Sequence, residues 1–439
     1  MTGIPGLVLA APATGSGKTT ATLGLLRAFK RQGLAVAPAK VGPDYIDPAF
    51  HARASGRSCF NLDSWAMRPP MLAGLISKAG QDCAFILAEG VMGLFDGAPV
   101  AQGPDGSTAD LAARAGWPVV LVLDAARMGA SAGAVLLGFA NFRADVRVAG
   151  VILNRIAGPG HQAMVERACR QACPEVAILG ALPRVEGLSL PSRHLGLVQA
   201  GEHADLERLI ERAADLVCDH VDLSALQALA APSLLQGAFE SPLPPLGQRI
   251  AVARDDAFAF AYPALLDGWK SQGAGLSFFS PLAGEGPVAD ADAVYLPGGY
   301  PELHGPRLSA ASGFLGGLTA AAERGAWIFG ECGGFMALGQ AIIDAEGRSQ
   351  SMAGLLPLVT DFQNRQLHLG YRQARLKADT PLGRAGSRFR GHEFHYATVQ
   401  SQDEGGSLFE AWDAKSAALG GMGLIRNRIF GSFLHLIAD

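Results

Sequence analysis

The stretch A-P-A-T-G-S-G-K-T-T, residues 11–20, decides the fold of the first half of the chain. It follows the apolar run Leu7 to Ala10 and precedes an Ala- and Leu-rich stretch, Ala21 to Arg31, which predicts a strand, a glycine-rich turn and a helix in that order. Such an arrangement aims backbone N–H groups and the helix dipole at phosphate oxygens. The sequence therefore predicts a phosphate-binding loop that holds a nucleotide.

The residue types in this loop suit that role. Gly15 and Gly17 let the backbone approach the phosphates closely, and Lys18 can bridge the terminal phosphates. Thr19 can bind magnesium through its hydroxyl. The residues expected to contact the nucleotide are Thr14, Gly15, Ser16, Gly17, Lys18 and Thr19. Pro12 stands where the first glycine of the usual pattern would fall, so an ordinary strand-to-helix turn is the alternative.

Short apolar runs alternate with helical stretches through the first half, which is typical of a parallel sheet flanked by helices. The further strands expected there are residues 35–39, 84–88, 119–123, 148–153 and 176–179. Residues 231–248 contain four prolines, which break helices, and are predicted to link a domain at 1–230 to a second α/β domain at 249–439. Strands in that second domain are expected at residues 249–253, 293–296 and 326–329.

Composition excludes several classes of protein. The 439 residues are 49% hydrophobic and 17% charged, which fits two globular domains and argues against disorder. A formal net charge of -4, without a basic stripe, makes nucleic acid an unexpected partner. The six cysteines form no C-x-x-C pair, so a reducing cytoplasm is expected and neither a disulfide framework nor a zinc site is suggested. No secretory leader or membrane span is expected.

Acidic side chains follow two of the expected strands. K-V-G-P-D-Y-I-D-P, residues 40–48, follows the second strand, and A-E-G-V-M-G-L-F-D-G, residues 88–97, follows the third. Both segments should lie beside the phosphate loop, at the carboxyl edge of the sheet. Glu89 is the strongest magnesium-ligand candidate, and further carboxylates available for metal or substrate are Asp44, Asp47 and Asp96. Each could instead cap a helix or a turn. Asn154 could read an adenine edge or simply form a turn.

The run G-A-W-I-F-G-E-C-G-G-F-M-A-L-G, residues 325–339, reads as a strand, then G-x-C-x-G, then a helix. This is the pattern of a nucleophile elbow with cysteine as the nucleophile, and a helix N-terminus is expected to lower the pKa of the Cys332 thiol. Y-L-P-G-G-Y-P-E, residues 295–302, adds a Gly-Gly turn, so the backbone N–H groups of Gly299 and Gly333 are expected to form an oxyanion hole. A buried structural cysteine is the alternative.

A cysteine nucleophile needs a base, and the sequence offers three histidines. His435 follows a strand-like run in the C-terminal segment and is the preferred choice. R-G-H-E-F-H-Y, residues 390–396, offers His392 and His395 as rivals, or as structural histidines. This run is not the zinc motif H-E-x-x-H, because only two residues separate its histidines.

Taken together, eight ordered motifs resemble those of the cobyrinic acid a,c-diamide synthase family of cobalamin biosynthesis, which also includes the hydrogenobyrinic acid enzymes. The resemblance covers nearly the whole chain. Besides the segments quoted above, it rests on R-H-L-G-L-V at residues 193–198 and A-V-A-R-D-D-A-F-A-F at residues 251–260. It implies a dethiobiotin-synthetase-like P-loop domain followed by a class I glutamine amidotransferase domain with a flavodoxin-like sheet.

The resemblance also implies roles for individual residues. ATP would bind residues 11–19 with Asn154 near the adenine, and magnesium would bind Thr19 and Glu89. Carboxylate activation would fall to Asp44, Asp47 and Asp96, with Tyr45 and Ile46 near the corrinoid, and glutamine would react at Cys332 with His435 as base. ATP would convert the a and c acetate groups of the corrin ring to acyl phosphates, which ammonia then displaces. A cytoplasmic homodimer is the family-level expectation.

Several points stay open on the residues alone. Many class I amidotransferases place Glu two residues after the catalytic histidine, where this chain has Ile437. Cobalt-containing and metal-free corrinoids are not distinguished, and a nickel-sirohydrochlorin diamide synthase is close in pattern. A P-loop ATPase switch is disfavoured because Ala13 stands at its signature lysine position. A noncatalytic C-terminal half is a further alternative, which glutaminase activity would exclude.

Overall fold

The computed structural model of the protein forms two compact units. Unit 1 comprises Met1–Ala98 and Gln102–Glu240, and unit 2 comprises Pro99–Ala101 and Ser241–Asp439. The residues that the structure describes are 3–100, 102–185, 187–188, 192–193, 196–197, 199–202, 205–402 and 406–439. Half of the motif at residues 193–198, namely residues 194, 195 and 198, lies outside this described part.

Unit 1 is built on an eight-stranded sheet whose main strand order is β3-β2-β4-β1-β5-β6-β7. Its strands are β1 (Pro5–Ala10), β2 (Val36–Val41), β3 (Phe60–Leu62), β4 (Phe85–Glu89), β5 (Val119–Asp124), β6 (Val148–Ile156), β7 (Ala177–Pro183) and β10 (Ala231–Pro232). All neighbours along the main order are parallel, whereas β10 pairs antiparallel with β1. The apolar runs of the central strands suit burial on both faces. The predicted parallel sheet is confirmed.

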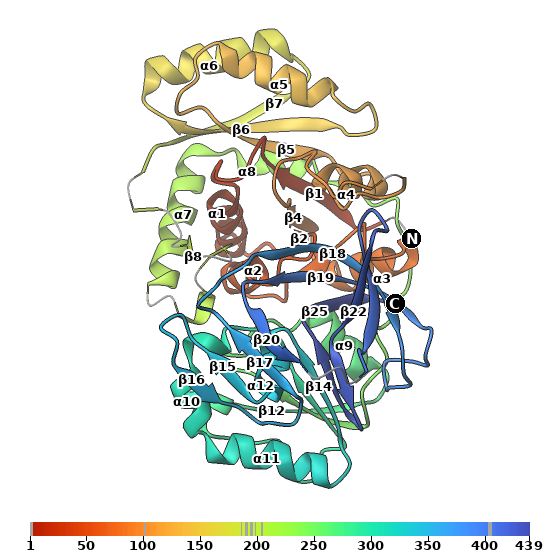
Figure 1. Ribbon diagram of the computed structural model, residues 1–439. Coiled ribbons are helices and arrows are strands. Elements are labelled where there is room, and N and C mark those ends of the chain that lie inside the picture. Colours follow the sequence, from red (N-terminus) through yellow and green to blue (C-terminus); the bar gives the residue numbers. More distant parts are fainter. Residues whose placement is uncertain are drawn as a thin grey trace. The chain divides into compact units, whose positions relative to one another are not determined.

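Helices cover this sheet. They are α1 (Lys18–Arg31), α2 (Asp47–Ser55), α3 (Pro69–Ala79), α4 (Thr108–Ala115), α5 (Ser131–Asn141), α6 (Pro159–Ala172), α7 (Leu206–His220) and α8 (Leu223–Ala228). In Figure 1, α1 and α7 lie side by side, as do α5 and α6. A Cβ at Gly24 of α1 would lie 2.5 Å from the carbonyl oxygen of Ala213 in α7, so glycine permits the close approach of these two helices. The phosphate loop is therefore anchored at its start by β1 of the sheet and at its end by α1.

Unit 2 contains a six-stranded sheet of order β12-β11-β13-β14-β24-β23. Its strands are β11 (Arg249–Ala253), β12 (Gly275–Phe279), β13 (Ala293–Leu296), β14 (Trp327–Glu331), β23 (Leu424–Arg426) and β24 (Ile429–Ser432). The helices are α9 (Pro263–Ser271), α10 (Gly305–Ala310), α11 (Ser312–Glu323) and α12 (Gly333–Leu338). The five parallel strands follow the flavodoxin-like order 2-1-3-4-5, which confirms the predicted fold class.

Two further sheets in unit 2 were not predicted from the sequence. One has the order β16-β15-β17-β20, and the other, which is antiparallel, has the order β22-β21-β18-β19-β25. Their strands are β15 (Ala341–Ile343), β16 (Ser349–Ser351), β17 (Leu358–Asp361), β18 (His368–Leu376), β19 (Arg388–His395), β20 (Thr398–Gln402), β21 (Phe409–Asp413), β22 (Ala418–Met422) and β25 (Leu434–Ala438). Partly solvated strands such as β18 and β22 lack a continuous apolar run, so periodicity does not reveal them.

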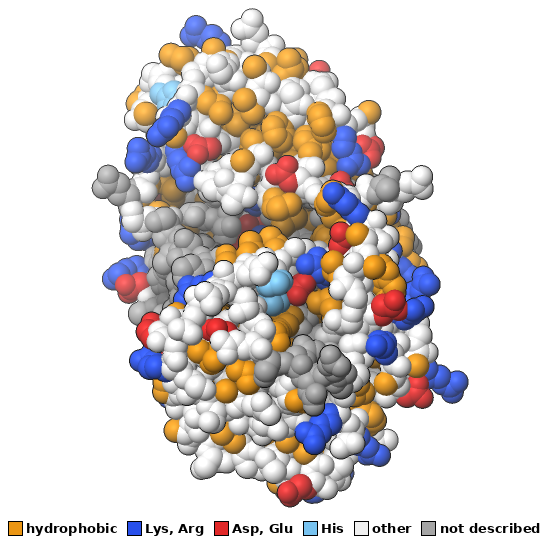
Figure 2. Space-filling model, in the orientation of Figure 1, with side chains coloured by type: hydrophobic (Ala, Val, Ile, Leu, Met, Phe, Trp, Pro, Cys, Tyr) orange, Lys and Arg blue, Asp and Glu red, His pale blue; other side chains and the backbone are white. Residues whose placement is uncertain are grey.

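On the face shown in Figure 2, described Lys and Arg side chains are interspersed with Asp and Glu. None of the helices in the described part of the chain has the length and apolar character needed to cross a lipid bilayer. All six cysteines are free thiols.

Candidate active sites

The phosphate loop of unit 1 joins β1 to α1 and depends on glycine. Gly15 and Gly17 have φ angles of 83° and 89°, which favour glycine. A Cβ at Gly17 would also lie 2.2 Å from Nδ2 of Asn154. That amide nitrogen donates to the Ser16 carbonyl oxygen at 2.8 Å. Asn154 therefore braces the loop from β6, and its contact with adenine stays a prediction.

A cavity of about 740 Å³ adjoins the loop, a size suited to a nucleotide. It is lined by Pro12, Ala13, Thr14, Gly15, Ser16, Leu123, Asp124, Ala126, Arg127, Met128, Arg155 and Arg184. Arg155 donates to the Gly15 carbonyl oxygen at 2.9 Å and forms an ion pair with Asp124. Three arginine side chains line this cavity, which suits the negative charge of phosphates.

Glu89 ends β4 and is fully buried at the centre of a polar cluster. Its Oε1 accepts hydrogen bonds from the Thr19 hydroxyl at 2.8 Å and the Lys40 ammonium at 3.1 Å. Its Oε2 lies 2.6 Å from Nε2 of His51. Burial acts to raise the pKa of Glu89, but Lys40 and His51 outweigh it and hold that pKa below its usual value. Glu89 is therefore an ionised carboxylate beside the phosphate loop.

The oxygen atoms of Thr19 and Glu89 suit a magnesium ion. Adjacent ligands of octahedral magnesium, with bonds of about 2 Å, lie about 3 Å apart. The Thr19 hydroxyl and Glu89 Oε1 are 2.8 Å apart. A carboxylate and a hydroxyl are also the hard oxygen ligands that magnesium prefers. These two residues fit the ion in donor type and spacing.

Asp44 and Asp47 occupy the turn between β2 and α2. Oδ1 of Asp44 accepts from the backbone N–H groups of Ile46 at 2.8 Å and Asp47 at 3.2 Å, so this carboxylate holds the turn that leads into α2. Asp47 forms an ion pair with Lys40, which joins Asp47 to the Glu89 cluster. Burial and the charge of Asp44 raise the pKa of Asp47 to about 7. Neither carboxylate is isolated from the cluster.

The loop after β4 rests on the phosphate loop. Leu94 N–H donates to the Ala11 carbonyl oxygen at 2.9 Å, and the Lys18 ammonium donates to the Met92 carbonyl oxygen at 2.7 Å. Asp96 is exposed and its Oδ2 accepts from the Gly93 N–H at 2.9 Å. The structure thus places Asp96 in a local turn, and its predicted role in catalysis stays a prediction.

Tyr45 and Ile46, predicted to lie near a second substrate, precede α2. Their exposed fractions are 8% and 5%. The structure therefore brings them next to the acidic cluster but leaves little of either side chain at the surface. Their contact with a corrinoid stays a prediction.

Cys332 forms a sharp turn between β14 and α12 in unit 2. Its φ of 46° and ψ of -104° are rare for a non-glycine residue, as a nucleophile elbow requires. A Cβ at Gly334 would lie 1.9 Å from the Leu296 carbonyl oxygen, so the turn needs a glycine there. The backbone N–H of Cys332 donates to the Ser432 carbonyl oxygen at 2.8 Å. The predicted strand–elbow–helix geometry is confirmed.

The expectation that the helix terminus lowers the thiol pKa is wrong for this conformation. Cys332 is only 4% exposed, and burial followed by the Glu302 carboxylate raises the pKa of its thiol. The hydrogen bond of Gly333 N–H acts in the opposite direction but is outweighed. The sulfur is therefore a thiol, so a base must remove its proton before attack.

Two glycine segments meet beside the elbow. A Cβ at Gly333 would lie 2.9 Å from the Gly299 nitrogen. A Cβ at Gly299 would lie 2.0 Å from the Ala257 carbonyl oxygen, so glycine is required for this packing. The backbone of the Gly-Gly turn thus lies against the start of α12. This placement is compatible with the predicted oxyanion hole at Gly299 and Gly333.

His435 lies on β25, opposite His392 of β19, and is fully buried. A Cβ at Gly298 would lie 2.3 Å from Cε1 of His435, so the imidazole packs on the Gly-Gly turn. Burial, followed by the charges of His392 and His395, lowers the pKa of His435 to about 3. The imidazole is therefore neutral, but the lowered pKa makes it a weaker base in this conformation, and the role of His435 as base stays a prediction.

His395 has different surroundings. Its Nε2 lies 3.0 Å from Oε1 of Glu393 and its ring stacks on Phe433 with centroids 3.8 Å apart. Arg372 donates to the other Glu393 oxygen at 2.7 Å. His368, Glu393 and His395 are close enough to hold a metal ion, but the two imidazoles are parallel to within 8°, so their nitrogens do not converge on one point. We assign no metal to this cluster.

Comparison with known proteins agrees with both halves. The CobQ/CobB/MinD/ParA nucleotide binding domain matches residues 7–198, and the CobB/CobQ-like glutamine amidotransferase domain matches residues 249–439. Hydrogenobyrinate a,c-diamide synthase of Brucella abortus biovar 1 is 53% identical, with 98% of each chain covered. The chain belongs to the hydrogenobyrinate a,c-diamide synthase family. The Rhizobium meliloti member is 52% identical over 98% of this chain and 99% of its own. The two domains make the chain a glutamine-dependent amide-forming ligase.

Three residues in the nucleotide half of the chain contact the phosphate loop or the acidic cluster although no role was predicted for them from the sequence. Lys40 begins the K-V-G-P-D segment, and only the fold shows that its ammonium bridges Asp47 and Glu89. His51 is one helical turn beyond Asp47, a spacing that could have indicated a shared face. Arg155 directly follows Asn154, and its contact with the phosphate loop leaves no signal in the sequence.

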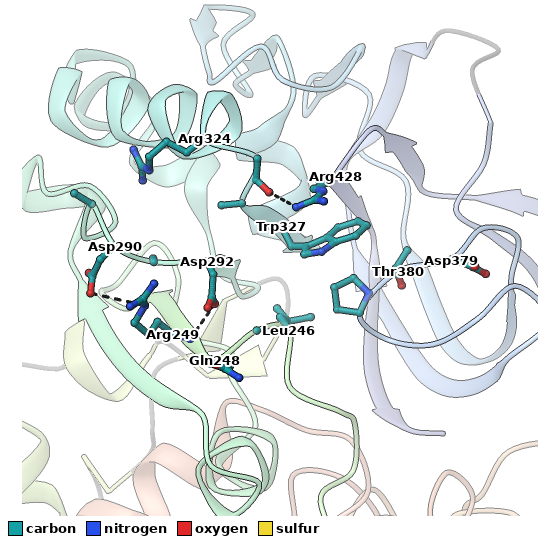
Figure 3. A pocket seen from close by; sticks show the side chains of 16 residues that line it. Leu246, Gln248, Arg249, Asp290, Asp292, Arg324, Trp327, Asp379, Thr380 and Arg428 are labelled. Carbon is teal, nitrogen blue, oxygen red and sulfur yellow. Dashed lines mark hydrogen bonds and ion pairs between the residues drawn. The ribbon is translucent and has the colours of Figure 1, made fainter.

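A second cavity, about 820 Å³ in volume, lies in unit 2 of the chain (Figure 3). Arg249 and Trp327, the first residues of β11 and β14, line it, so it lies at the sheet edge opposite Cys332. Two of its arginines pair with other lining residues: Arg249 with Asp290 at 3.8 Å, and Arg428 with the Gly325 carbonyl oxygen at 2.7 Å. We assign no chemistry to this cavity.

Proposed function

We propose that this chain converts the a and c acetate carboxylates of hydrogenobyrinic acid to amides, with ATP as the energy source and glutamine as the nitrogen donor. One observation carries the proposal: a single chain holds an arginine-lined phosphate-loop cavity and a buried cysteine elbow. Both lie within the length matched by relatives named for this reaction. The names of those relatives favour the metal-free ring over cobyrinic acid.

Carboxylate activation is assigned to unit 1. The substrate carboxylate attacks the γ-phosphorus of ATP, forming an acyl phosphate and releasing ADP. Lys18 and the loop N–H groups bind the phosphates, and Glu89 with Thr19 would hold magnesium, which supplies charge neutralisation at the phosphate oxygens. Asp47, held by Lys40, is placed to orient the incoming substrate beside this site. The acyl phosphate then carries a good leaving group.

Glutamine hydrolysis is assigned to unit 2. His435 takes the thiol proton of Cys332, and the thiolate attacks the side-chain amide carbon of glutamine. The backbone N–H groups of Gly299 and Gly333 stabilise the oxyanion, and the departing nitrogen takes the proton and leaves as ammonia. Water then hydrolyses the glutamyl thioester to glutamate and regenerates the thiol. The imidazole of His435 is neutral in this buried position, but the fall of its pKa to about 3 weakens it as a base, so the assignment rests on its position and not on that shift.

Ammonia closes the reaction by attacking the acyl phosphate. The carbon–nitrogen bond forms, the bond to the phosphate oxygen breaks, and inorganic phosphate leaves. Repetition at the second acetate gives the diamide. A homodimer is proposed on the family resemblance alone, and light scattering on the purified chain tests it.

Mass spectrometry tests the proposed reaction. Hydrogenobyrinic acid and cobyrinic acid are incubated separately with the protein, Mg-ATP and glutamine. Two successive mass shifts, each replacing OH by NH2, are expected, with faster conversion of the metal-free ring. An unchanged mass for both rings, with glutaminase activity intact, would contradict the proposal and direct attention to other tetrapyrroles such as nickel-sirohydrochlorin.

A further inference from the structure

Glu331, the last residue of β14, directly precedes the nucleophile Cys332. Its side chain is fully buried within unit 2. A carboxylate is costly to bury unless its oxygens accept hydrogen bonds, so the partners of Glu331 indicate what it does. The proposed mechanism gives this residue no role.

Two hydrogen-bond donors meet at the Glu331 carboxylate. The backbone N–H of Leu436 donates to Oε1 at 2.9 Å, and the Tyr295 hydroxyl donates to Oε2. Leu436 follows the base His435 on β25, and Tyr295 lies on β13, which leads into the Gly-Gly turn. The carboxylate thus connects the segments that carry the nucleophile, the base and the turn against which the imidazole packs.

Strand topology explains why such a connection is needed. β24 belongs to the six-stranded sheet whose strand β14 leads into Cys332. β25 begins two residues after β24 ends, but it is the edge strand of the five-stranded sheet. His435 therefore lies on a strand that has left the sheet of its nucleophile. An edge strand has backbone N–H groups without a neighbouring strand, and Glu331 accepts the one from Leu436.

We propose that Glu331 is the positioning residue that fixes His435 relative to Cys332, in place of the acidic residue absent at Ile437. The inference rests on the proposed glutaminase chemistry. Ile437 is a buried apolar residue, and because its side chain carries no charge it offers the imidazole no charged partner. The acidic residue reaches the base strand from β14 instead.

Charge does not explain Glu331. Burial and Glu302 are the leading causes that raise the thiol pKa of Cys332, and the Glu331 carboxylate acts in the same direction. Burial raises the pKa of Glu331 to about 7, and in its ionised form the negative charge disfavours the thiolate, so Glu331 would hinder the nucleophile if electrostatics were its only effect. The remaining role for Glu331 is a geometric one. Its carboxylate holds β25 through the Leu436 N–H and β13 through the Tyr295 hydroxyl.

The test compares Glu331→Ala with Glu331→Gln in the full-length protein. Gln keeps an acceptor for Leu436 N–H, and its amide can donate to the Tyr295 hydroxyl, so Glu331→Gln is expected to keep most of the glutaminase kcat. Ala removes both bonds, and its kcat is expected to fall about 100-fold, as displaced catalytic groups typically cause. The KM for glutamine and the ammonium-driven synthesis should not change in either variant.

Asp361→Ala is the matched control. Asp361 is 2% exposed. Like Glu331, its carboxylate accepts one backbone and one side-chain hydrogen bond: from the Gln363 N–H at 2.7 Å and from the Gln400 amide at 2.6 Å. It lies on β17, in a sheet that holds neither Cys332 nor His435. Loss of a buried carboxylate at this position should lower stability and leave kcat unchanged.

Each outcome separates the inference from the proposed function. A wild-type kcat in Glu331→Ala, or an equal loss in Glu331→Gln, overturns the positioning role while leaving the function intact. If Glu331→Ala does not fold, Tyr295→Phe decides, because it removes one anchor only; lowered kcat at constant KM supports the inference and unchanged kcat overturns it. Glutaminase activity that survives in Cys332→Ser contradicts the proposed function instead.

Discussion

The Thr19 hydroxyl donates a 2.8 Å hydrogen bond to the Glu89 carboxylate, although the two residues are 70 positions apart in the chain. One lies in the first turn of α1 and the other at the carboxyl end of β4. This bond joins the phosphate loop to the acidic cluster that contains Lys40 and His51. The nucleotide and the carboxylate that it activates are therefore expected to meet at Glu89.

Glu89→Gln should abolish amide formation with glutamine and with ammonium alike. The change keeps the size of the side chain but removes the charge that would neutralise magnesium, and a loss of about 100-fold or more is expected. Product formation over a magnesium titration measures it, with thermal unfolding as a check on folding. Asp145→Asn, which alters an exposed ion pair with Arg143, is the control. Ammonium-driven turnover at the wild-type rate would contradict the role of Glu89.

Lys18→Ala should also stop synthesis from either nitrogen source. The Lys18 ammonium is buried next to the phosphate loop, and burial lowers its pKa, so the change removes a cation from a site with little solvent. Loss of ATP-dependent acyl phosphate formation, trapped with hydroxylamine as the hydroxamate, is the direct measurement. Full ammonium-driven turnover in this variant would refute the assignment.

Cys332→Ser separates the two sites. We expect glutamine-dependent synthesis to disappear, because a serine hydroxyl in this buried elbow is a much weaker nucleophile than a thiolate. Synthesis at high ammonium concentration should persist, since ammonia then reaches the acyl phosphate without glutamine. Comparing both nitrogen sources on one enzyme preparation provides the measurement. Equal loss with the two sources would show that the sites are not separable.

His435→Gln and His395→Gln decide between the rival bases. Removal of the true base should lower the glutaminase kcat by about 100-fold or more, and we expect this for His435. His395 is held by Glu393 and Phe433, so its removal should act mainly on stability. Steady-state glutaminase kinetics and thermal unfolding of both variants measure these effects. A larger kcat loss in His395→Gln would reverse the assignment.

The burial of His435 also predicts a pH dependence of stability. The pKa of His435 falls from 6.5 to about 3 on folding, so the unfolded chain takes up a proton below pH 6.5 that the folded chain does not. The stabilising contribution is thus present above pH 6.5 and is lost as the pH falls towards 3. Between pH 7 and pH 5 this amounts to about 2 kcal/mol. Calorimetry should show a smaller loss in His435→Gln, and equal losses would count against a neutral buried imidazole.

Much of the fold could be predicted because its signals are local. The apolar runs that became β1, β5 and β11 each lie within one short segment, and the glycines of the phosphate loop mark a turn by their own conformational freedom. The strands β18 to β22 could not be predicted in this way. One face of these strands is partly solvated, and their partners lie many residues away, so neither periodicity nor length identifies them.

The sequence by itself determined the chemistry that each segment can perform: a phosphate loop before Lys18, acidic side chains after two strands, and a thiol on a sharp turn at Cys332. The tertiary structure determined which of those groups contact one another and how their pKa values shift. It brought Thr19 against Glu89, joined Glu331 to the strand of His435, and raised the thiol pKa that the local helix was expected to lower. The reason is physical: turn geometry depends on neighbouring residues, whereas desolvation and hydrogen-bond partners depend on residues distant in the chain.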